Sequence, residues 1–269
     1  LWAVLASPAV HTQGPGRGEK WVASWAASPH GPYPSGNPSA QPDLSAVFET
    51  AAEGAVDQTF RLIVKPDLWG TSARIRLSNV FGARPVTFDD VFVGLQTSGG
   101  NVAAGTNRQV RFERGRTSVT IPAGASVASD AIVLDFVKSP SDPLLSGRKL
   151  VVSFHVAGSS GPMTWHAKAL TTSYVSAPRA GSHGREESDA AFPFTTTSWY
   201  FLDAVDVAAA ADVVVVACFG DSITDGTAST LNGDDRWPDV LSRRLREKFG
   251  ARVSVVNAGI GGNRVLSPA

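Results

Sequence analysis

The chain has 269 residues, of which 43% are hydrophobic and 18% charged, so it can bury a large core and does not have the composition of a disordered protein. Its 24 Lys and Arg residues balance its 24 Asp and Glu residues, and no basic run occurs. This balance argues against nucleic acid or an anionic membrane surface as a partner, and it favours small neutral ligands. The length fits two domains. No apolar stretch reaches the ~20 residues of a membrane span.

The N-terminal segment has the pattern of an export signal. Residues Leu1–Val10 are apolar and precede a stretch of small residues, which resembles the end of a signal peptide and its cleavage zone. We therefore expect residues 1–18 to be the remainder of a signal and linker, and the protein to be secreted, extracellular or periplasmic. An ordinary apolar terminus is the alternative. The first residue is Leu1 and not Met, which suggests that the sequence begins inside the signal.

Residues 21–207 show the pattern of an all-β domain, with short apolar runs separated by Gly, Pro, Asn or Asp. The expected strands are Phe60–Val64, Ala73–Leu77, Val91–Leu95, Ser118–Ile121, Ala131–Val137 and Leu150–Val156. Apolar and polar residues alternate at 74–77 and 149–156, which predicts antiparallel strands with one solvated face. We predict a β-sandwich of jelly-roll type, with Ser28–Pro42 as a surface loop.

The pattern changes after Asp206. Ala208–Ala211 is expected to be a connector, and Val213–Phe219 is apolar throughout, as in a strand buried on both faces of a parallel sheet. A helix is predicted over Pro238–Phe249, where apolar residues recur at helical spacing before Gly250. Val253–Val256 would form the next strand.

Strand, helix and strand together predict the first right-handed βαβ unit of an α/β domain of flavodoxin-like type. Two strands and one helix leave most of the apolar surface of such a sheet in water. We therefore expect the domain at residues 212–269 to be incomplete and the chain to be truncated. Cys218 is the single cysteine, so the sequence contains no disulfide framework and no Cys-based metal site.

A serine lies where the first of these parallel strands passes into a loop. The segment reads Phe219-Gly220-Asp221-Ser222-Ile223-Thr224-Asp225-Gly226. Open α/β sheets bind ligands at the carboxyl ends of their strands, and Gly220 leaves room for a substrate to approach the Ser222 hydroxyl. This location favours a nucleophile. The alternative is a Ser-Asp turn in which Ser222 bonds the local backbone.

A glycine-rich loop follows the second strand, and it should emerge beside the first loop. It reads Asn257-Ala258-Gly259-Ile260-Gly261-Gly262-Asn263. Main-chain N–H groups in such a loop can stabilise an oxyanion that develops on an attacked carbonyl. A tight strand exit is the alternative, and a phosphate cradle is disfavoured because the spacing matches neither nucleotide-binding fingerprint.

With these two loops the sequence resembles the GDSL/SGNH hydrolase family over about residues 212–269. The stretch Asp235–Leu241 is also similar to an arylesterase-like branch associated with plant polysaccharide breakdown. The resemblance implies that Ser222 is the nucleophile and donates its N–H to the oxyanion, and that Gly262 donates a second N–H. Gly220 and Asp221 would support the turn, Asp221 in a structural role.

Two further motifs of the family are missing from the sequence: a Gly-x-Asn-Asp segment with a third oxyanion donor, and an Asp-x-x-His with the general base and its orienting carboxylate. All five histidines precede Ser222: His11, His30, His155, His166 and His183. A histidine of the β domain could serve as base, because triads are defined by geometry. We expect instead that His155 and His166 are strand residues and that the base is absent.

The resemblance implies a serine esterase that forms an acyl-enzyme and needs no metal or cofactor, acting on a small ester or an acylated carbohydrate. Without the base, the chain as given should be close to inactive. The competing hypothesis is a carbohydrate-binding sandwich with a non-catalytic partial hydrolase domain, in which tryptophans stack on sugar rings. The candidate residues for stacking are Trp25, Trp69, Trp165 and Trp199. Core packing is the interpretation that we favour for them. A lipase is less favoured, since no apolar lid is visible.

Overall fold

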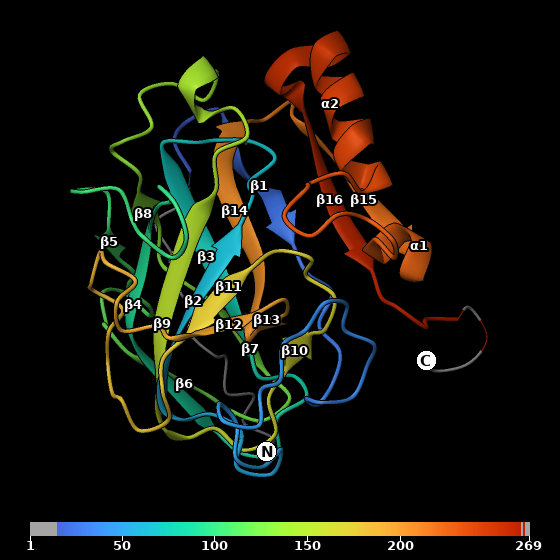
Figure 1. The fold of residues 1–269 in the computed structure, drawn as a ribbon. Helices are drawn as coiled ribbons and strands as arrows, with labels where there is room; N and C mark the ends of the chain where they lie inside the picture. Colours follow the sequence, from blue (N-terminus) through green and yellow to red (C-terminus); the bar gives the residue numbers. More distant parts are fainter. Residues whose placement is uncertain (1–14, 265, 267–269) are drawn as a thin grey trace, which may run out of the picture.

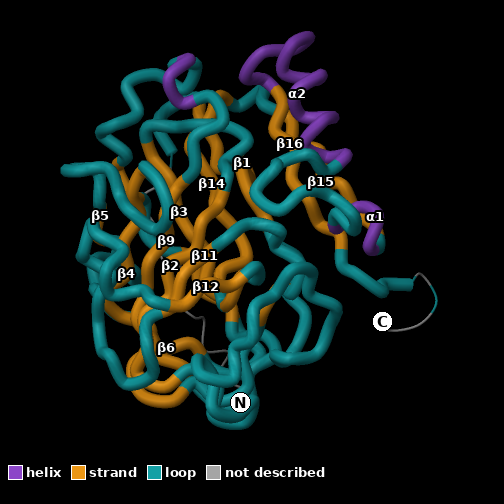
Figure 2. The backbone as a smooth tube through the Cα atoms, viewed as in Figure 1, coloured by secondary structure: helices purple, strands orange, loops and turns teal. Residues whose placement is uncertain are grey.

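The computed structural model describes residues 15–264 and residue 266. It consists of a large β-rich body, residues 15–210, and a smaller C-terminal unit, residues 214–264, which lies alongside strand β1 (Figure 1). Helical segments of the described chain are confined to the C-terminal unit, apart from the short 3-10 helix η1 (Pro143–Leu145) (Figure 2). Among the described residues, no helix combines the length and hydropathy needed to cross a membrane. The proposed export signal, Leu1–Val10, lies outside the described residues.

Two antiparallel sheets build the β-rich body. The first sheet consists of β1 (Glu19–Ala26), β14 (Leu202–Ala210), β3 (Ser72–Ser78) and β7 (Ser126–Ala128) in this order, with β8 (Ile132–Val133) also paired to β3. The second sheet consists of β12 (Phe194–Thr196), β11 (Ser173–Val175), β2 (Val56–Val64), β9 (Leu150–Ser159), β4 (Val86–Leu95) and β5 (Arg108–Gln109), with β6 (Val119–Ile121) paired to β4. A two-stranded ladder joins β10 (Trp165–His166) to β13 (Trp199–Tyr200). The prediction of a largely antiparallel β fold is confirmed, and the jelly-roll connection stays a prediction.

One hydrophobic core receives side chains from both sheets. Phe60 of β2 lies 5.4 Å from Phe154 of β9 between ring centroids, and both contact Phe201, at 5.9 and 6.3 Å. From the first sheet, Ile75 and Val205 are fully buried in the same cluster. This arrangement agrees with a sandwich, because each sheet buries one face against the other.

The alternation predicted for β3 is confirmed, whereas that for β9 is wrong. Ile75 is buried while Arg76 is exposed, but Leu150–Val156 of β9 are all buried. The outer face of β9 is covered by loops that the buried Arg61 holds: its guanidinium donates to the carbonyls of Gly100 and Ser188 at 3.1 and 2.7 Å. Polar residues on that face are therefore buried and hydrogen-bonded, which the alternation by itself cannot reveal.

Two segments differ from the predicted boundaries. Residues 131–137 form the two-residue strand β8 and not a long strand, and η1 and loops follow it. Ala208–Ala210, expected to be a connector, are the end of β14, where they pair with Glu19–Trp21 of β1. A run of alanines does not end a strand when the neighbouring strand supplies its main-chain hydrogen bonds. Strand β14 therefore continues through these residues.

The C-terminal unit contains β15 (Val214–Gly220), α1 (Ser222–Asp225), α2 (Trp237–Phe249), the 3-10 helix η2 (Gly250–Arg252) and β16 (Val253–Gly259). Strands β15 and β16 pair in parallel from Val214↔Val253 to Gly220↔Gly259, so the predicted order of strand, helix and strand is present. Helix α2 starts where the Asp239 carboxylate accepts the Arg236 N–H at 3.1 Å, and it ends at Gly250 with φ 61°.

The prediction that the first of these strands is buried on both faces is wrong. Strand β15 is the outer strand of the pair, and Val214 and Phe219 expose 57% and 78% of their surface. Strand β16 takes the inner position beside β1 (Figure 1). Helix α2 packs against β16, but its Trp237 and Phe249 remain 43% and 37% exposed. The apolar run therefore belongs to a parallel strand whose outer face has no cover among the described residues.

Candidate active site

The Ser222 hydroxyl belongs to a short turn at the carboxyl end of β15. We call residues 220–227 the nucleophile turn, after the role that the family resemblance implies for Ser222. Asp221 caps α1, since its Oδ1 accepts the Ile223 N–H at 3.0 Å, and the Ser222 carbonyl accepts the Gly226 N–H at 3.0 Å. Ser222 itself is half-buried at the surface. At Gly220 an added Cβ would lie 2.3 Å from the Thr224 Oγ1, so the turn requires glycine there.

The glycine-rich loop, residues 257–263, lies directly against the nucleophile turn. The Ile260 N–H donates to the Gly220 carbonyl at 3.0 Å, and the Asn257 side chain donates to the Thr224 carbonyl at 2.7 Å. A Cβ on Gly259 would lie 2.3 Å from the Asp225 nitrogen, so no larger residue fits. Gly262 has φ 85°, a conformation that favours glycine, and it is exposed. The two loops that were expected to adjoin are thus side by side.

Asp225 lies in the segment that carries Ser222, and the sequence pattern by itself indicates no role for it. It is 1% exposed, and its Oδ2 accepts the Gly261 N–H at 2.8 Å, so it ties the nucleophile turn to the glycine-rich loop. Its Oδ1 lies 3.0 Å from the Nε2 of His166, which comes from β10 of the β-rich body. Asp225 lies close to Ser222 in the sequence and could be found from that motif. Nothing in the sequence indicates that its partner is His166, 59 residues earlier.

The electrostatics of this carboxylate follow from its partners. Burial by itself raises the pKa of Asp225, but the hydrogen bond and charge of His166, the charge of Arg236 and the Gly261 N–H outweigh burial and hold that pKa below its ordinary value. Asp225 is therefore a carboxylate at neutral pH.

None of the four described histidines is hydrogen-bonded to Ser222. His166 faces acceptors at both ring nitrogens: its Nδ1 lies 2.9 Å from the Ser28 carbonyl, and its Nε2 lies 3.2 Å from that of Lys168. With its nitrogens directed at these carbonyl oxygens, the ring is not placed to take the proton of the Ser222 hydroxyl. His155 lies between Asp89 and Asp57, at 2.6 and 2.8 Å.

The remaining described histidines also make no hydrogen bond to Ser222. His183 bonds Glu186 at 2.7 Å. His30 has both nitrogens buried without a hydrogen-bond partner, and its pKa is lowered to about 4 by burial first and then by the charge of His166, against the opposing charge of Asp225. His11 lies outside the described residues. Within the described part of the chain, no group of three or more His, Cys, Asp and Glu residues is arranged to hold a metal ion.

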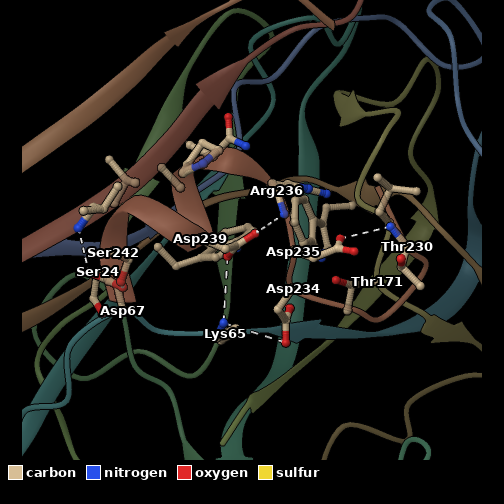
Figure 3. A pocket seen from close by; sticks show the side chains of 18 residues that line it. Ser24, Lys65, Asp67, Thr171, Thr230, Asp234, Asp235, Arg236, Asp239 and Ser242 are labelled. Carbon is tan, nitrogen blue, oxygen red and sulfur yellow. Dashed lines mark hydrogen bonds and ion pairs between the residues drawn. The ribbon is translucent and has the colours of Figure 1, made fainter. Parts of the chain in front are cut away.

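A small cavity of about 70 Å³ lies where the β-rich body meets the C-terminal unit (Figure 3). Charged side chains surround it: Lys65 lies 3.8 Å from both Asp234 and Asp239. Neither Ser222 nor Gly262 is among its lining residues. It has room for about two water molecules, so it is part of the interface and too small for an ester substrate.

The four tryptophans considered as sugar-stacking platforms are buried. Trp25, Trp69, Trp165 and Trp199 are 7%, 5%, 2% and 4% exposed. The indole N–H of Trp165 donates to the Ser35 carbonyl at 2.8 Å, and that of Trp199 to the Ile63 carbonyl at 2.9 Å. Their faces contact protein, as in the ring pair of Trp25 and Trp199 at 4.8 Å. Core packing is confirmed as their role, and the carbohydrate-binding hypothesis loses the residues that supported it.

Comparison with known protein families gives a match in the region that contains the two loops. A model of the GDSL-like Lipase/Acylhydrolase family matches residues 218–269, a range that contains both the nucleophile turn from Gly220 onward and the glycine-rich loop. No curated protein sequence matches the chain. The C-terminal end of this chain, residues 218–269, is therefore assigned to the GDSL-like lipase/acylhydrolase family.

Proposed function

We propose that the protein is a secreted serine esterase that cleaves carboxylic esters through an acyl-enzyme on Ser222. One observation carries the proposal: the turn that presents Ser222 and the loop that presents Gly262 are joined by the hydrogen bond from the Ile260 N–H to the Gly220 carbonyl at 3.0 Å. Acyl transfer requires a nucleophile and, beside it, main-chain N–H groups that stabilise the oxyanion; both loops lie at the same edge of the sheet.

The chemistry has two steps. The Ser222 oxygen attacks the ester carbonyl, the alcohol leaves, and the acyl group stays on Ser222; water then attacks this acyl-enzyme and releases the acid. The N–H groups of Ser222 and Gly262 are the proposed donors to the oxyanion. A general base must take the Ser222 proton, and the family resemblance assigns it to an Asp-x-x-His motif that this sequence lacks. We therefore expect little activity from these 269 residues by themselves, and we place the test in the full-length protein.

We further propose an ester of a carbohydrate, such as an acetylated polysaccharide, as substrate. Support comes from the similarity of Asp235–Leu241 to the arylesterase-like, polysaccharide-associated branch of the family. The apolar segment Leu1–Val10 supports export, and an extracellular polymer fits a secreted enzyme.

The test compares two serine variants of the full-length protein on p-nitrophenyl acetate and on acetylated xylan. Ser222→Ala should lower kcat by at least about 10³-fold, because the nucleophile is lost. Ser229→Ala is the matched control: it lies in the same unit, its side chain makes no hydrogen bond among the described residues, and its activity should stay within twofold. Hydrolysis that persists in Ser222→Ala contradicts the proposal.

A further inference from the structure

Asp225 fixes the spacing of the two loops that form the proposed site. Its Oδ2 accepts the Gly261 N–H at 2.8 Å, while its main-chain N–H donates to the Asp221 carbonyl at 2.9 Å. The carboxylate thus lies between the turn of Ser222 and the residue that precedes Gly262. A rotation of this side chain would break the bond to Gly261, the residue next to Gly262, while the bonds of Ile260 and Asn257 to the nucleophile turn stay in place.

The β-rich body supplies the side chain that lies against the other oxygen of this carboxylate. His166 Nε2 lies 3.0 Å from Asp225 Oδ1, and the two side chains are 4% and 2% exposed. A buried carboxylate that loses its partner is strongly destabilised, so it turns towards water or takes up a proton. Either change weakens its bond to Gly261.

A second contact from the same segment supports the turn. The buried Lys168 Nζ donates to the Thr227 Oγ1 at 2.6 Å. The side chains of residues 166 and 168 thus both contact the C-terminal unit, His166 at Asp225 and Lys168 at Thr227. In return, the Arg236 guanidinium donates to the Lys168 carbonyl at 3.1 Å and to the Ala169 carbonyl.

We propose that His166 is a positioning residue for the proposed esterase reaction: through Asp225 it sets the distance between Ser222 and the oxyanion donor of Gly262. The β-rich body is then a working part of the active site and not an appended binding module. His166 does not act as the base, because both of its nitrogens face acceptors. This inference rests on the proposed function of Ser222.

The test measures kcat and KM separately in the full-length protein. His166→Ala and Asp225→Asn should each lower kcat by about 10²-fold, the effect of losing one oxyanion donor, with KM within about threefold. Because both variants break the same contact between His166 and Asp225, their effects should not add. The kcat of the double variant should lie no more than about threefold below the lower of the two single-variant values. His166→Gln, which keeps a donor, should recover part of kcat.

The matched control is His155→Ala. His155 is also buried and paired with two carboxylates, but its partners Asp57 and Asp89 lie within the β-rich body. His155→Ala should lower the melting temperature while kcat stays within twofold of the unchanged protein.

The inference is overturned if kcat is retained in both His166→Ala and Asp225→Asn, or if His155→Ala lowers kcat as much as His166→Ala does. Should His166→Ala fail to fold, Asp225→Asn, which keeps the side-chain volume, decides by the same criterion. Ser222→Ala separates the two proposals: activity unaffected by that variant defeats the proposed function itself.

Discussion

The carboxylate of Asp67 accepts a hydrogen bond from the main-chain N–H of Val255, with 2.6 Å between Oδ2 and the nitrogen. Asp67 follows β2 in the β-rich body and Val255 lies in β16, so this bond joins the two parts directly. Ser242 of α2 donates to the same carboxylate, and Arg246 lies 3.4 Å from it. Strand β16 packs beside β1 but the two belong to different sheets, and side-chain contacts hold it there.

Replacing Asp67 should loosen the C-terminal unit. Asp67→Ala leaves the Val255 N–H without its acceptor, and we expect a loss of about 1–3 kcal/mol in the free energy of unfolding. Urea denaturation and protease cleavage within residues 211–232 measure it. Asp135→Ala, which breaks the largely exposed pair with Arg108, should cost less than about 1 kcal/mol. Equal losses in the two variants would contradict a special role for Asp67.

Enlarging Gly259 should separate the two loops of the site. The added Cβ of Gly259→Ala would lie 2.3 Å from the Asp225 nitrogen, and φ is not left-handed there, so the effect is steric. We expect a kcat loss of about 10²-fold and a stability loss of about 1–3 kcal/mol. In Gly158→Ala the Cβ meets nothing within 4 Å, although φ is 72°, so about 1 kcal/mol of stability should be lost with kcat unchanged. Full activity in Gly259→Ala would show that the loops need not adjoin.

Truncating Trp199 should affect stability and not polysaccharide binding. Trp199 is 4% exposed, and Trp199→Ala should cost about 3–5 kcal/mol because it opens a cavity in the core. Chemical denaturation measures the loss, and retention on immobilised xylan below the melting temperature measures binding. A stable Trp199→Ala protein that no longer binds xylan would restore the stacking hypothesis.

His30 should make the protein less stable in acid. Its pKa falls from 6.5 to about 4 on folding, so between these values the unfolded chain binds the proton and the folded chain does not. The stability present above pH 6.5 is therefore lost as pH falls towards 4. We expect a loss of about 1–2 kcal/mol, because the change in pKa corresponds at most to about 3 kcal/mol and His30 as a whole residue is only half-buried, so that solvent screens part of it. Denaturant unfolding at pH 7 and 4.5 should show a smaller difference in His30→Leu; an unchanged difference would exclude His30 as its source.

Local patterns predicted the elements of the site, whereas the long-range contacts required the structure. The strand before Ser222, the helix ending at Gly250 and the loop of Gly262 follow from apolar runs, capping and glycine spacing. The contact of His166 with Asp225 joins residues far apart in the chain, and neither residue lies in a sequence pattern that indicates the other as its partner. Burial of β9 was missed for a similar reason: the cover comes from loops held by Arg61, which periodicity along one strand does not report.

Covalent labelling of the full-length protein tests the central proposal most directly. A fluorophosphonate reacts with an activated serine to give a stable phosphonyl ester, and peptide mass spectrometry then locates the adduct. We predict an adduct on the peptide that contains Ser222, and no adduct in Ser222→Ala while Ser229→Ala is labelled as before. Ester hydrolysis together with an adduct on another serine, or with none at Ser222, would contradict the assignment of Ser222 as the nucleophile.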